Sequence, residues 1–125
     1  TGTGETILVV EDNSEGREVA KQRLEVLGYT LLEAETAAAA IEILQLSRAN
    51  IRLVFSDVVM PGGMTGFDLA RWVAANAPGI EVVLTSGYPD EIALAQEDKL
   101  PAIRLLRKPY NRAELARAMR DALGK

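Results

Sequence analysis

The sequence predicts an α/β domain with a doubly wound, five-stranded parallel sheet and helices on both faces of the sheet. The first observation is that short apolar runs suited to strands alternate along the chain with segments of helical character. The second is that the strand segments are almost purely apolar, as is typical of strands buried on both faces. Parallel strands need crossover connections, and helices in those connections cover the two faces.

The first strand and helix are predicted within residues 7–28. Residues 7–10 form an apolar, β-branched run that stops at two acidic residues. Ser14 is placed to cap the following helix, and Gly28 stands where a left-handed carboxy-terminal cap would end it. Between these two residues, apolar side chains recur at helical spacing at Ala20, Leu24 and Leu27.

The same unit of strand and helix is predicted again along the rest of the chain. The later strands are predicted at residues 30–34, 53–56, 82–84 and 103–106. The later helices are predicted to follow Thr36, to begin at about residue 66, to form a short polar segment near residues 90–97, and to follow Asn111. Asn111 and Glu114 have the spacing of a capping box, which makes the last helix well specified.

The composition excludes several classes of function. The chain has 125 residues, which suits one domain, and it contains no Cys and no His. Disulfide frameworks, thiol nucleophiles, Cys/His zinc sites and imidazole-dependent triads are therefore excluded. The net charge of −4 has the wrong sign for a domain that binds the nucleic-acid backbone, so we expect no direct contact with nucleic acid.

The distribution of apolar and polar residues predicts the boundaries and location of the domain. The apolar stretches are far shorter than a membrane span, so we expect no membrane contact by this domain and a cytoplasmic location. Residues 1–5 are polar and rich in glycine, which predicts a flexible tail or linker. The domain itself is expected to occupy residues 6–125.

Polar residues follow the predicted strands at the edge where ligands bind in open parallel sheets. Glu11 and Asp12 follow the first strand, Asp57 the third, Thr85 the fourth and Lys108 the fifth. Each of them alone is more simply explained as a helix cap, a strand end or a solvated surface residue. Their occurrence at successive ends of apolar strands favours a shared functional site.

The chemistry of these side chains indicates metal-assisted phosphoryl transfer. Three carboxylates close together repel one another unless a cation is supplied, and Lys108 provides only one positive charge. An oxygen-rich site without His or Cys suits Mg²⁺. A carboxylate can also act as a nucleophile and form an aspartyl phosphate, and Asp57 on the central strand is the best candidate.

Four segments in this order and spacing carry a resemblance to a known family. They are the acidic pair after ILVV, LVFSDVVMPGGMTG around Asp57, LTSGY with Thr85, and LLRKPY with Lys108. Over nearly its whole length the chain resembles the receiver domain of two-component response regulators, including single-domain regulators and receivers of hybrid histidine kinases. The resemblance implies a flavodoxin-like fold with strand order 2-1-3-4-5.

The resemblance also implies roles for the residues of the predicted site. Asp57 would accept a phosphoryl group from a phosphohistidine of a histidine kinase or histidine phosphotransfer protein. Mg²⁺ would be bound directly by Asp12, Asp57 and the backbone carbonyl of Val59, and through a water molecule by Glu11. Thr85 would bind a phosphoryl oxygen and Lys108 would pair with the phosphoryl group.

Three further positions concern how the domain would switch or orient its site. The aromatic residue that the family usually places three residues before the lysine is replaced by Leu105, so the usual coupling of threonine to an aromatic residue cannot operate in that form. Tyr88 is a candidate substitute, although a packed surface tyrosine is an equally good interpretation. The bond between Lys108 and Pro109 is expected to be cis from the resemblance, with an ordinary trans bond as the alternative.

Two alternatives to a phospho-acceptor domain stay open. A Mg²⁺-dependent phosphohydrolase would use the same aspartyl phosphate, but it should carry an acid or base at position 59, where this chain has Val59. An interaction module that acts without phosphorylation is the other alternative, although all the residues needed for phosphorylation are present. We therefore expect no enzyme activity beyond phosphorylation and dephosphorylation of the domain itself, and we leave open a weak homodimer.

Overall fold

A computed structural model of the chain describes residues 4–47, 50–58, 64–87, 103–108 and 110–124. Five parallel strands form one sheet in the order β2-β1-β3-β4-β5. The strands are β1 (Thr6–Val10), β2 (Thr30–Ala34), β3 (Leu53–Asp57), β4 (Glu81–Ser86) and β5 (Ile103–Arg107). The fold class and the strand order predicted from the sequence are confirmed.

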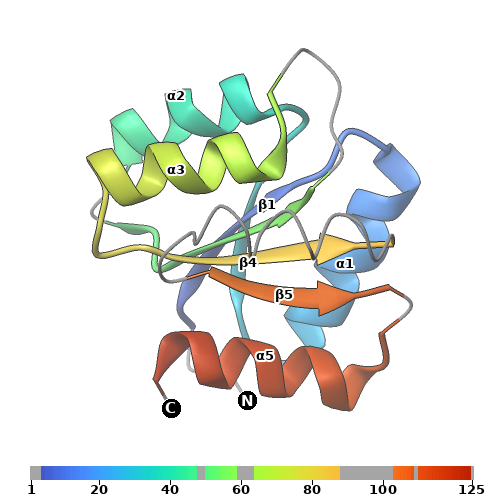
Figure 1. Ribbon diagram of the computed structural model, residues 1–125. Helices are drawn as coiled ribbons and strands as arrows, with labels where there is room; N and C mark the ends of the chain where they lie inside the picture. Colours follow the sequence, from blue (N-terminus) through green and yellow to red (C-terminus); the bar gives the residue numbers. More distant parts are fainter. Residues whose placement is uncertain (1–3, 48–49, 59–63, 88–102, 109, 125) are drawn as a thin grey trace.

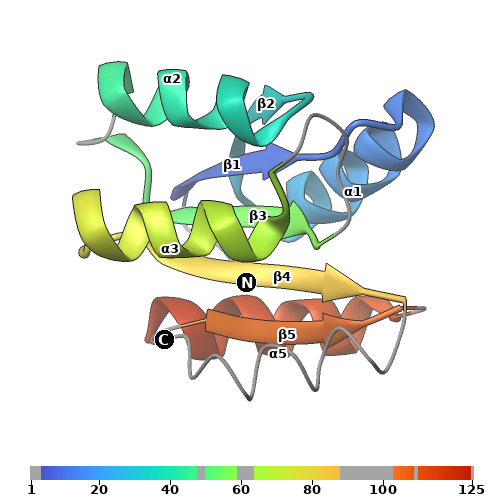
Figure 2. The ribbon, with the colours of Figure 1, turned by 45° about the horizontal axis from the view of Figure 1, so that its top comes forward.

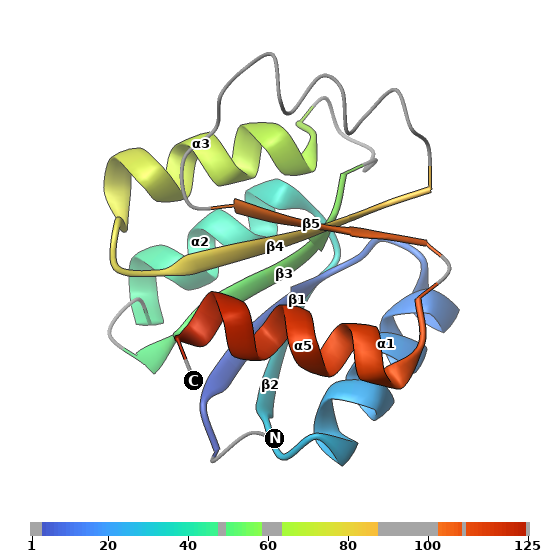
Figure 3. The same ribbon diagram turned by 60° about the horizontal axis from the view of Figure 1, so that its bottom comes forward.

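The described residues form four helices, which lie on both faces of the sheet (Figure 1). They are α1 (Ser14–Val26), α2 (Ala37–Ser47), α3 (Gly66–Asn76) and α5 (Arg112–Leu123). On one face, α2 packs over β1 and β2 while α3 packs over β4 (Figure 2). On the other face lie α1 and α5 (Figure 3). The predicted helix near residues 90–97 lies outside the described residues.

The core is divided by the sheet into two clusters, which explains why the strands are apolar throughout. In β1, Leu8 and Val10 belong to the cluster beneath α2 and α3, whereas Ile7 and Val9 belong to the cluster beneath α1 and α5. Each of these four side chains is at most 1% exposed. Since successive residues of a strand point to opposite faces, both sets must be apolar when helices cover both faces.

The helix ends agree with the predicted caps, with one correction. The cap of α1 is Asn13 rather than Ser14, because the Asn13 side chain accepts a hydrogen bond from the Gly16 amide at 2.8 Å and leaves Ser14 as the first helical residue. Gly28 has the left-handed backbone that its position predicted, with φ of 97°. The capping box of Asn111 and Glu114 at the start of α5 is present with both of its hydrogen bonds.

The beginning of the domain is tied to β2. The Gly4 amide donates to the Gly28 carbonyl at 3.0 Å, and the Thr30 amide donates to the Glu5 carbonyl at 3.0 Å. Glu5 is only 8% exposed. The predicted boundary between residues 5 and 6 stays a prediction. No helix in the described part of the chain is long and apolar enough to cross a membrane.

Candidate functional site

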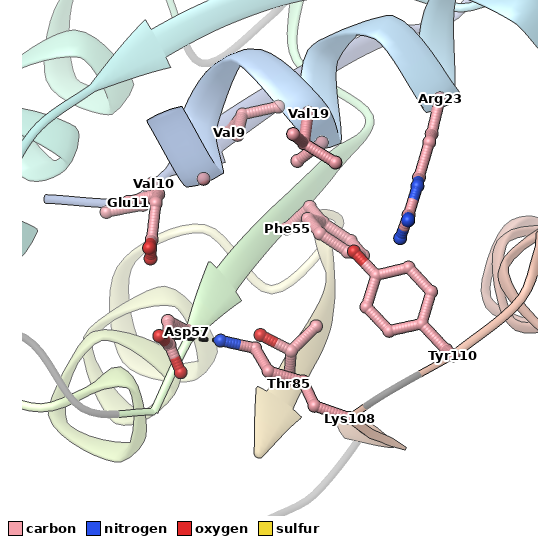
Figure 4. Close-up of a pocket in the computed structure, with 12 residues that line it drawn as sticks. Val9, Val10, Glu11, Val19, Arg23, Phe55, Asp57, Thr85, Lys108 and Tyr110 are labelled. Atoms are coloured by element: carbon pink, nitrogen blue, oxygen red, sulfur yellow. Dashed lines mark hydrogen bonds and ion pairs between the residues drawn. The ribbon is translucent and has the colours of Figure 1, made fainter. Parts of the chain in front are cut away.

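The carboxyl ends of the central strands bring together the polar residues that the sequence singled out. Asp57 is the last residue of β3 and stands opposite Thr85 of β4 in the parallel register. Lys108 directly follows β5, and Glu11 directly follows β1. All four line one pocket of about 510 Å³ on the α1 and α5 side of the sheet (Figure 4). The predicted convergence of these side chains is thus observed.

An ion pair joins the candidate nucleophile to the candidate cation. Lys108 Nζ donates to Asp57 Oδ2 at 2.9 Å, and the side chains of Lys108 and Asp57 are 40% and 16% exposed. The Lys108 amide also donates to the Ser86 carbonyl at 2.8 Å, which fixes the backbone that carries the ammonium. Burial alone would lower the pKa of Lys108, but the hydrogen bond and the negative charge of Asp57 outweigh it, so the pKa lies above its usual value. Lys108 is therefore a permanent positive charge at this site.

A second carboxylate faces Asp57 across the pocket. Burial and the negative charge of Asp57 raise the pKa of Glu11 from 4.5 to about 7, and the charge of Lys108 only partly opposes this. Two carboxylates therefore share a site in which one ammonium does not neutralise both. Such a site favours an additional cation whose preferred ligands are oxygen atoms.

Asp12 lies farther out than Glu11. Its side chain is exposed, and its negative charge contributes to the raised pKa of Glu11. Among the residues that the structure describes, no group of three or more acidic side chains is gathered closely enough to hold a metal ion by itself. The donor set of hard carboxylate oxygens nevertheless fits Mg²⁺, which commonly keeps several water ligands and takes only one or two carboxylates. Val59, the predicted carbonyl ligand, lies outside the described residues.

Thr85 lies deep at the same edge of the sheet. It is 3% exposed, and its carbonyl accepts a hydrogen bond from the Val58 amide at 3.0 Å, which ties β4 to the chain just after Asp57. Figure 4 shows the side chains of Asp57, Thr85 and Lys108 next to one another. A hydroxyl at this place can donate to an oxygen of a group attached to Asp57.

The opposite half of the pocket was not foreseen. Phe55 and Tyr110 meet edge to face, with ring centroids 6.4 Å apart and an interplanar angle of 77°. The Arg23 guanidinium carbon lies 5.2 Å from the centre of the Tyr110 ring. One signal could have revealed this wall, because the α1 residues that line the pocket have the i, i+3, i+4, i+7 spacing of one helix face: Gly16, Val19, Ala20 and Arg23.

The predicted switch positions lie apart from this pocket or outside the described residues. Leu105 is partly buried and packs against the core cluster beneath α2 and α3, so it points away from the α1 side. Tyr88 and Pro109 lie outside the described residues, and the predictions made for them stay predictions. The aromatic residues that do border the site are Phe55 of β3 and Tyr110, two positions after Lys108.

Comparison with known proteins identifies the family of this fold and site. The family model of the response regulator receiver domain matches residues 7–120. The chain belongs to this family. Among solved structures, a response regulator receiver domain protein from Clostridium thermocellum superimposes with a TM-score of 0.87 at 28% identity, over 95% of this chain and 94% of that one. The signal receiver domain of an HD domain-containing protein from Pseudomonas fluorescens superimposes with a TM-score of 0.84 at 32% identity, over 97% of this chain and 95% of that one.

Receivers in longer proteins are also similar to this chain. The sensor kinase CckA of Brucella abortus is 35% identical over 123 residues, which cover 96% of this chain and 13% of the kinase. The transcriptional regulatory protein DctD of Rhizobium meliloti, named for C4-dicarboxylate transport, is 29% identical over 94% of this chain and 25% of its own length. The chain therefore spans only a minor part of these relatives.

Proposed function

We propose that this receiver domain accepts a phosphoryl group on Asp57 in a two-component phosphorelay. The observation that carries the proposal is the 2.9 Å ion pair between Asp57 and Lys108, in an open pocket that also holds Glu11. Asp57 is only 16% exposed, but it lines this pocket, so a phosphodonor can reach it. Membership of the receiver family supports this role for the aspartate at the end of the third strand.

The phosphoryl donor would be a phosphohistidine of a histidine kinase or histidine phosphotransfer protein. A carboxylate oxygen of Asp57 attacks phosphorus, the phosphorus–nitrogen bond breaks, and the bonding electron pair stays on the imidazole nitrogen. Because the other ring nitrogen of the phosphohistidine carries a proton, the imidazole leaves as a neutral group, and the phosphoryl group is held on Asp57 as an acyl phosphate. Either partner would present its phosphohistidine to the pocket, from a separate protein or from the kinase part of a hybrid histidine kinase, and a weak homodimer is compatible with this function.

Lys108 and Thr85 would stabilise the charge that develops during transfer. The Lys108 ammonium donates to Asp57 Oδ2 in the unphosphorylated domain, and it can pair with a phosphoryl oxygen once that carboxylate is phosphorylated. The buried Thr85 hydroxyl would donate to another phosphoryl oxygen. Both groups are fixed to the sheet through their backbones, so they need little reorganisation when the charge appears.

Mg²⁺ would be held by the acidic residues beside Asp57. Asp12 and Asp57 would bind the ion directly together with the Val59 carbonyl, and Glu11 through a water molecule. When bound, the ion neutralises negative charge on the phosphoryl group and the carboxylates. The raised pKa of Glu11 supports this proposal, because burial and the negative charge of Asp57, which Lys108 only partly opposes, disfavour the charged carboxylate in the absence of a further cation.

Intact-mass spectrometry after incubation with acetyl phosphate and Mg²⁺ tests the proposed function. We expect one phosphoryl adduct on the wild type, no adduct when the metal is chelated, and no adduct on Asp57→Asn. An adduct that persists in folded Asp57→Asn would refute Asp57 as the acceptor. A folded wild type that neither gains a phosphoryl group nor binds Mg²⁺ would instead favour an interaction module that acts without phosphorylation.

A phosphate-release assay with external phosphate esters separates an acceptor domain from a phosphohydrolase. A phosphohydrolase would release phosphate repeatedly from external esters, and it would need an acid or base near the acyl phosphate to activate water. The chain has Val59 at the position expected for that group. We therefore propose that chemistry is limited to the domain's own Asp57, at a cytoplasmic location without nucleic-acid contact by this domain.

A further inference from the structure

The backbone of Glu11 is held on both sides by contacts that the proposed chemistry does not use. Its amide donates to the Ala34 carbonyl of β2 at 3.1 Å. Its carbonyl oxygen accepts a hydrogen bond from Nη1 of Arg17 at 2.7 Å. That carbonyl belongs to the peptide that joins Glu11 to Asp12, so whatever fixes it also sets the direction in which both carboxylates leave the main chain.

Arg17 is itself held in place by β2 and by the segment that follows it. Its Nε donates to Glu33 Oε1 at 3.0 Å, and its Nη2 lies 3.8 Å from Glu35 Oε1. The Arg17 side chain is only 14% exposed. A planar guanidinium with hydrogen bonds from two of its nitrogens and an ion pair at the third cannot rotate without losing a partner. Arg17 therefore links the loop after β1 to β2 through a rigid group.

We infer that Arg17 is a positioning residue for the acidic pair of Glu11 and Asp12. By fixing the peptide carbonyl between them, it holds the two carboxylates in the orientation that a divalent cation requires. This inference rests on the proposed function, because it assigns Arg17 a role in the Mg²⁺ site. Outer groups that orient the ligands of a metal commonly change its affinity as much as tenfold or more.

A positioning role and a purely electrostatic role of Arg17 predict changes in Mg²⁺ affinity of opposite sign when Arg17 is replaced. The positive charge of Arg17 repels a cation, so removal of this charge alone should strengthen Mg²⁺ binding slightly. Loss of the hydrogen bond to the Glu11 carbonyl should instead weaken Mg²⁺ binding. The direction of the change in affinity therefore distinguishes the two roles.

Lys21 offers a matched control on the same helix. It lies one turn after Arg17 and donates to the same carboxylate, at 2.9 Å from Glu33 Oε2, while its other bond goes to Glu18 at 3.3 Å. Lys21→Ala removes one positive charge and one bond to Glu33, as Arg17→Ala does, but it leaves the contact with the Glu11 carbonyl intact. Arg17→Lys keeps the charge and loses the fork of donors.

The test combines Mg²⁺ titration by calorimetry with hydrogen exchange of the Glu11 amide, which donates to the Ala34 carbonyl, in the metal-free protein. We expect Arg17→Ala to weaken Mg²⁺ binding about tenfold and to speed exchange of the Glu11 amide. The Mg²⁺ affinity of Arg17→Lys should lie between those of Arg17→Ala and the wild type. Lys21→Ala should bind Mg²⁺ as tightly as the wild type or slightly more tightly.

Three results would overturn the inference. The first is equal Mg²⁺ affinity and equal amide exchange in Arg17→Ala and Lys21→Ala, and the second is tighter Mg²⁺ binding by Arg17→Ala. The third, if Arg17→Ala does not fold, is wild-type Mg²⁺ affinity and amide exchange in Arg17→Lys. A wild type that binds no Mg²⁺ would count against the proposed metal site instead. The exchange rate of the Glu11 amide in Arg17→Ala and Lys21→Ala then still decides whether Arg17 holds this loop.

Discussion

Two helices begin beside the site, and each has a glycine in its first turn that meets the site in a different way. At Gly66, the first residue of α3, an added Cβ would lie 2.6 Å from the Asp57 carbonyl oxygen and 2.9 Å from the Val58 Cα. At Gly16 in α1, the nearest atom would be Oε1 of Glu11, at 2.9 Å. The first glycine thus faces main chain and the second faces the end of a flexible side chain.

This difference shows how rigidity is distributed around the pocket. The Gly66 amide donates to the Val58 carbonyl at 2.8 Å, so α3 is joined directly to the backbone that carries Asp57. On the α1 side, helix and loop are joined through side chains, with Asn13 as the cap and Arg17 on the Glu11 carbonyl. The backbone at Asp57 is therefore fixed by main-chain packing, whereas the carboxylate end of the Glu11 side chain keeps room to move.

The largest effect is expected from Gly66→Ala. Backbone atoms at 2.6 and 2.9 Å cannot yield as a side chain could, so the start of α3 must shift away from β3. We expect the free energy of unfolding to fall by about 2–3 kcal/mol, as measured by urea denaturation. Phosphorylation of Asp57 by acetyl phosphate should also slow, because the backbone next to the acceptor moves.

Gly79→Ala is the matched control for this substitution. A Cβ at Gly79 would meet no atom within 4 Å, so Gly79→Ala should change the free energy of unfolding by no more than about 0.5 kcal/mol. If Gly66→Ala and Gly79→Ala are equally stable, the close approach of α3 to β3 does not constrain the site.

The sequence predicted more of the β3 side of the site than of the α1 side, and the reason is physical. Asp57 lies within a strand, where the alternation of side chains and the parallel register fix its neighbours. Glu11 and Asp12 follow the end of β1, where alternation no longer applies. The sequence could not tell that Glu11 faces Asp57 while Asp12 stays exposed.

The caps teach a related lesson. The capping box predicted from the spacing of Asn111 and Glu114 is confirmed. Thr65 and Asp68 at the start of α3 have the same spacing, which the sequence analysis does not name, and the structure shows both hydrogen bonds of that capping box. At α1, two adjacent residues could cap the helix, and Asn13 does so because its backbone is extended (φ −78°, ψ 120°) while Ser14 is already helical. Tertiary geometry, rather than cap propensity, decides such cases.

An intermediate effect is expected from Glu11→Gln, as a dependence of stability on pH without metal. The pKa of Glu11 is 4.5 when unfolded and about 7 when folded, so the folded state binds more protons between these values. The free energy of unfolding of the wild type should therefore fall as pH rises from 4.5 to 7. After a discount for solvent screening, this loss is on the order of 1 kcal/mol.

Glu11→Gln should not show this loss, so the variant gains stability over the wild type above pH 7. Urea denaturation in the presence of a metal chelator, at several pH values, measures the difference. A constant gap between the two proteins from pH 4.5 to pH 8 would contradict the raised pKa of Glu11. Addition of Mg²⁺ should reverse the ranking, since the carboxylate then contributes to binding the ion.

The smallest change in stability is expected from Gly16→Ala, and it tests the other half of the comparison. The new methyl group displaces the Glu11 carboxylate from 2.9 Å, while alanine favours the helix more than glycine does, so the free energy of unfolding should change by less than about 0.5 kcal/mol. The carboxylate should move outward, because Asp57 repels it on the inner side. Its pKa should then fall from about 7 toward 4.5, as followed by NMR titration of the carboxyl carbon. If the pKa of Glu11 does not change while Gly16→Ala folds normally, Glu11 is held as firmly as Asp57, and the proposed contrast between the two sides of the pocket is wrong.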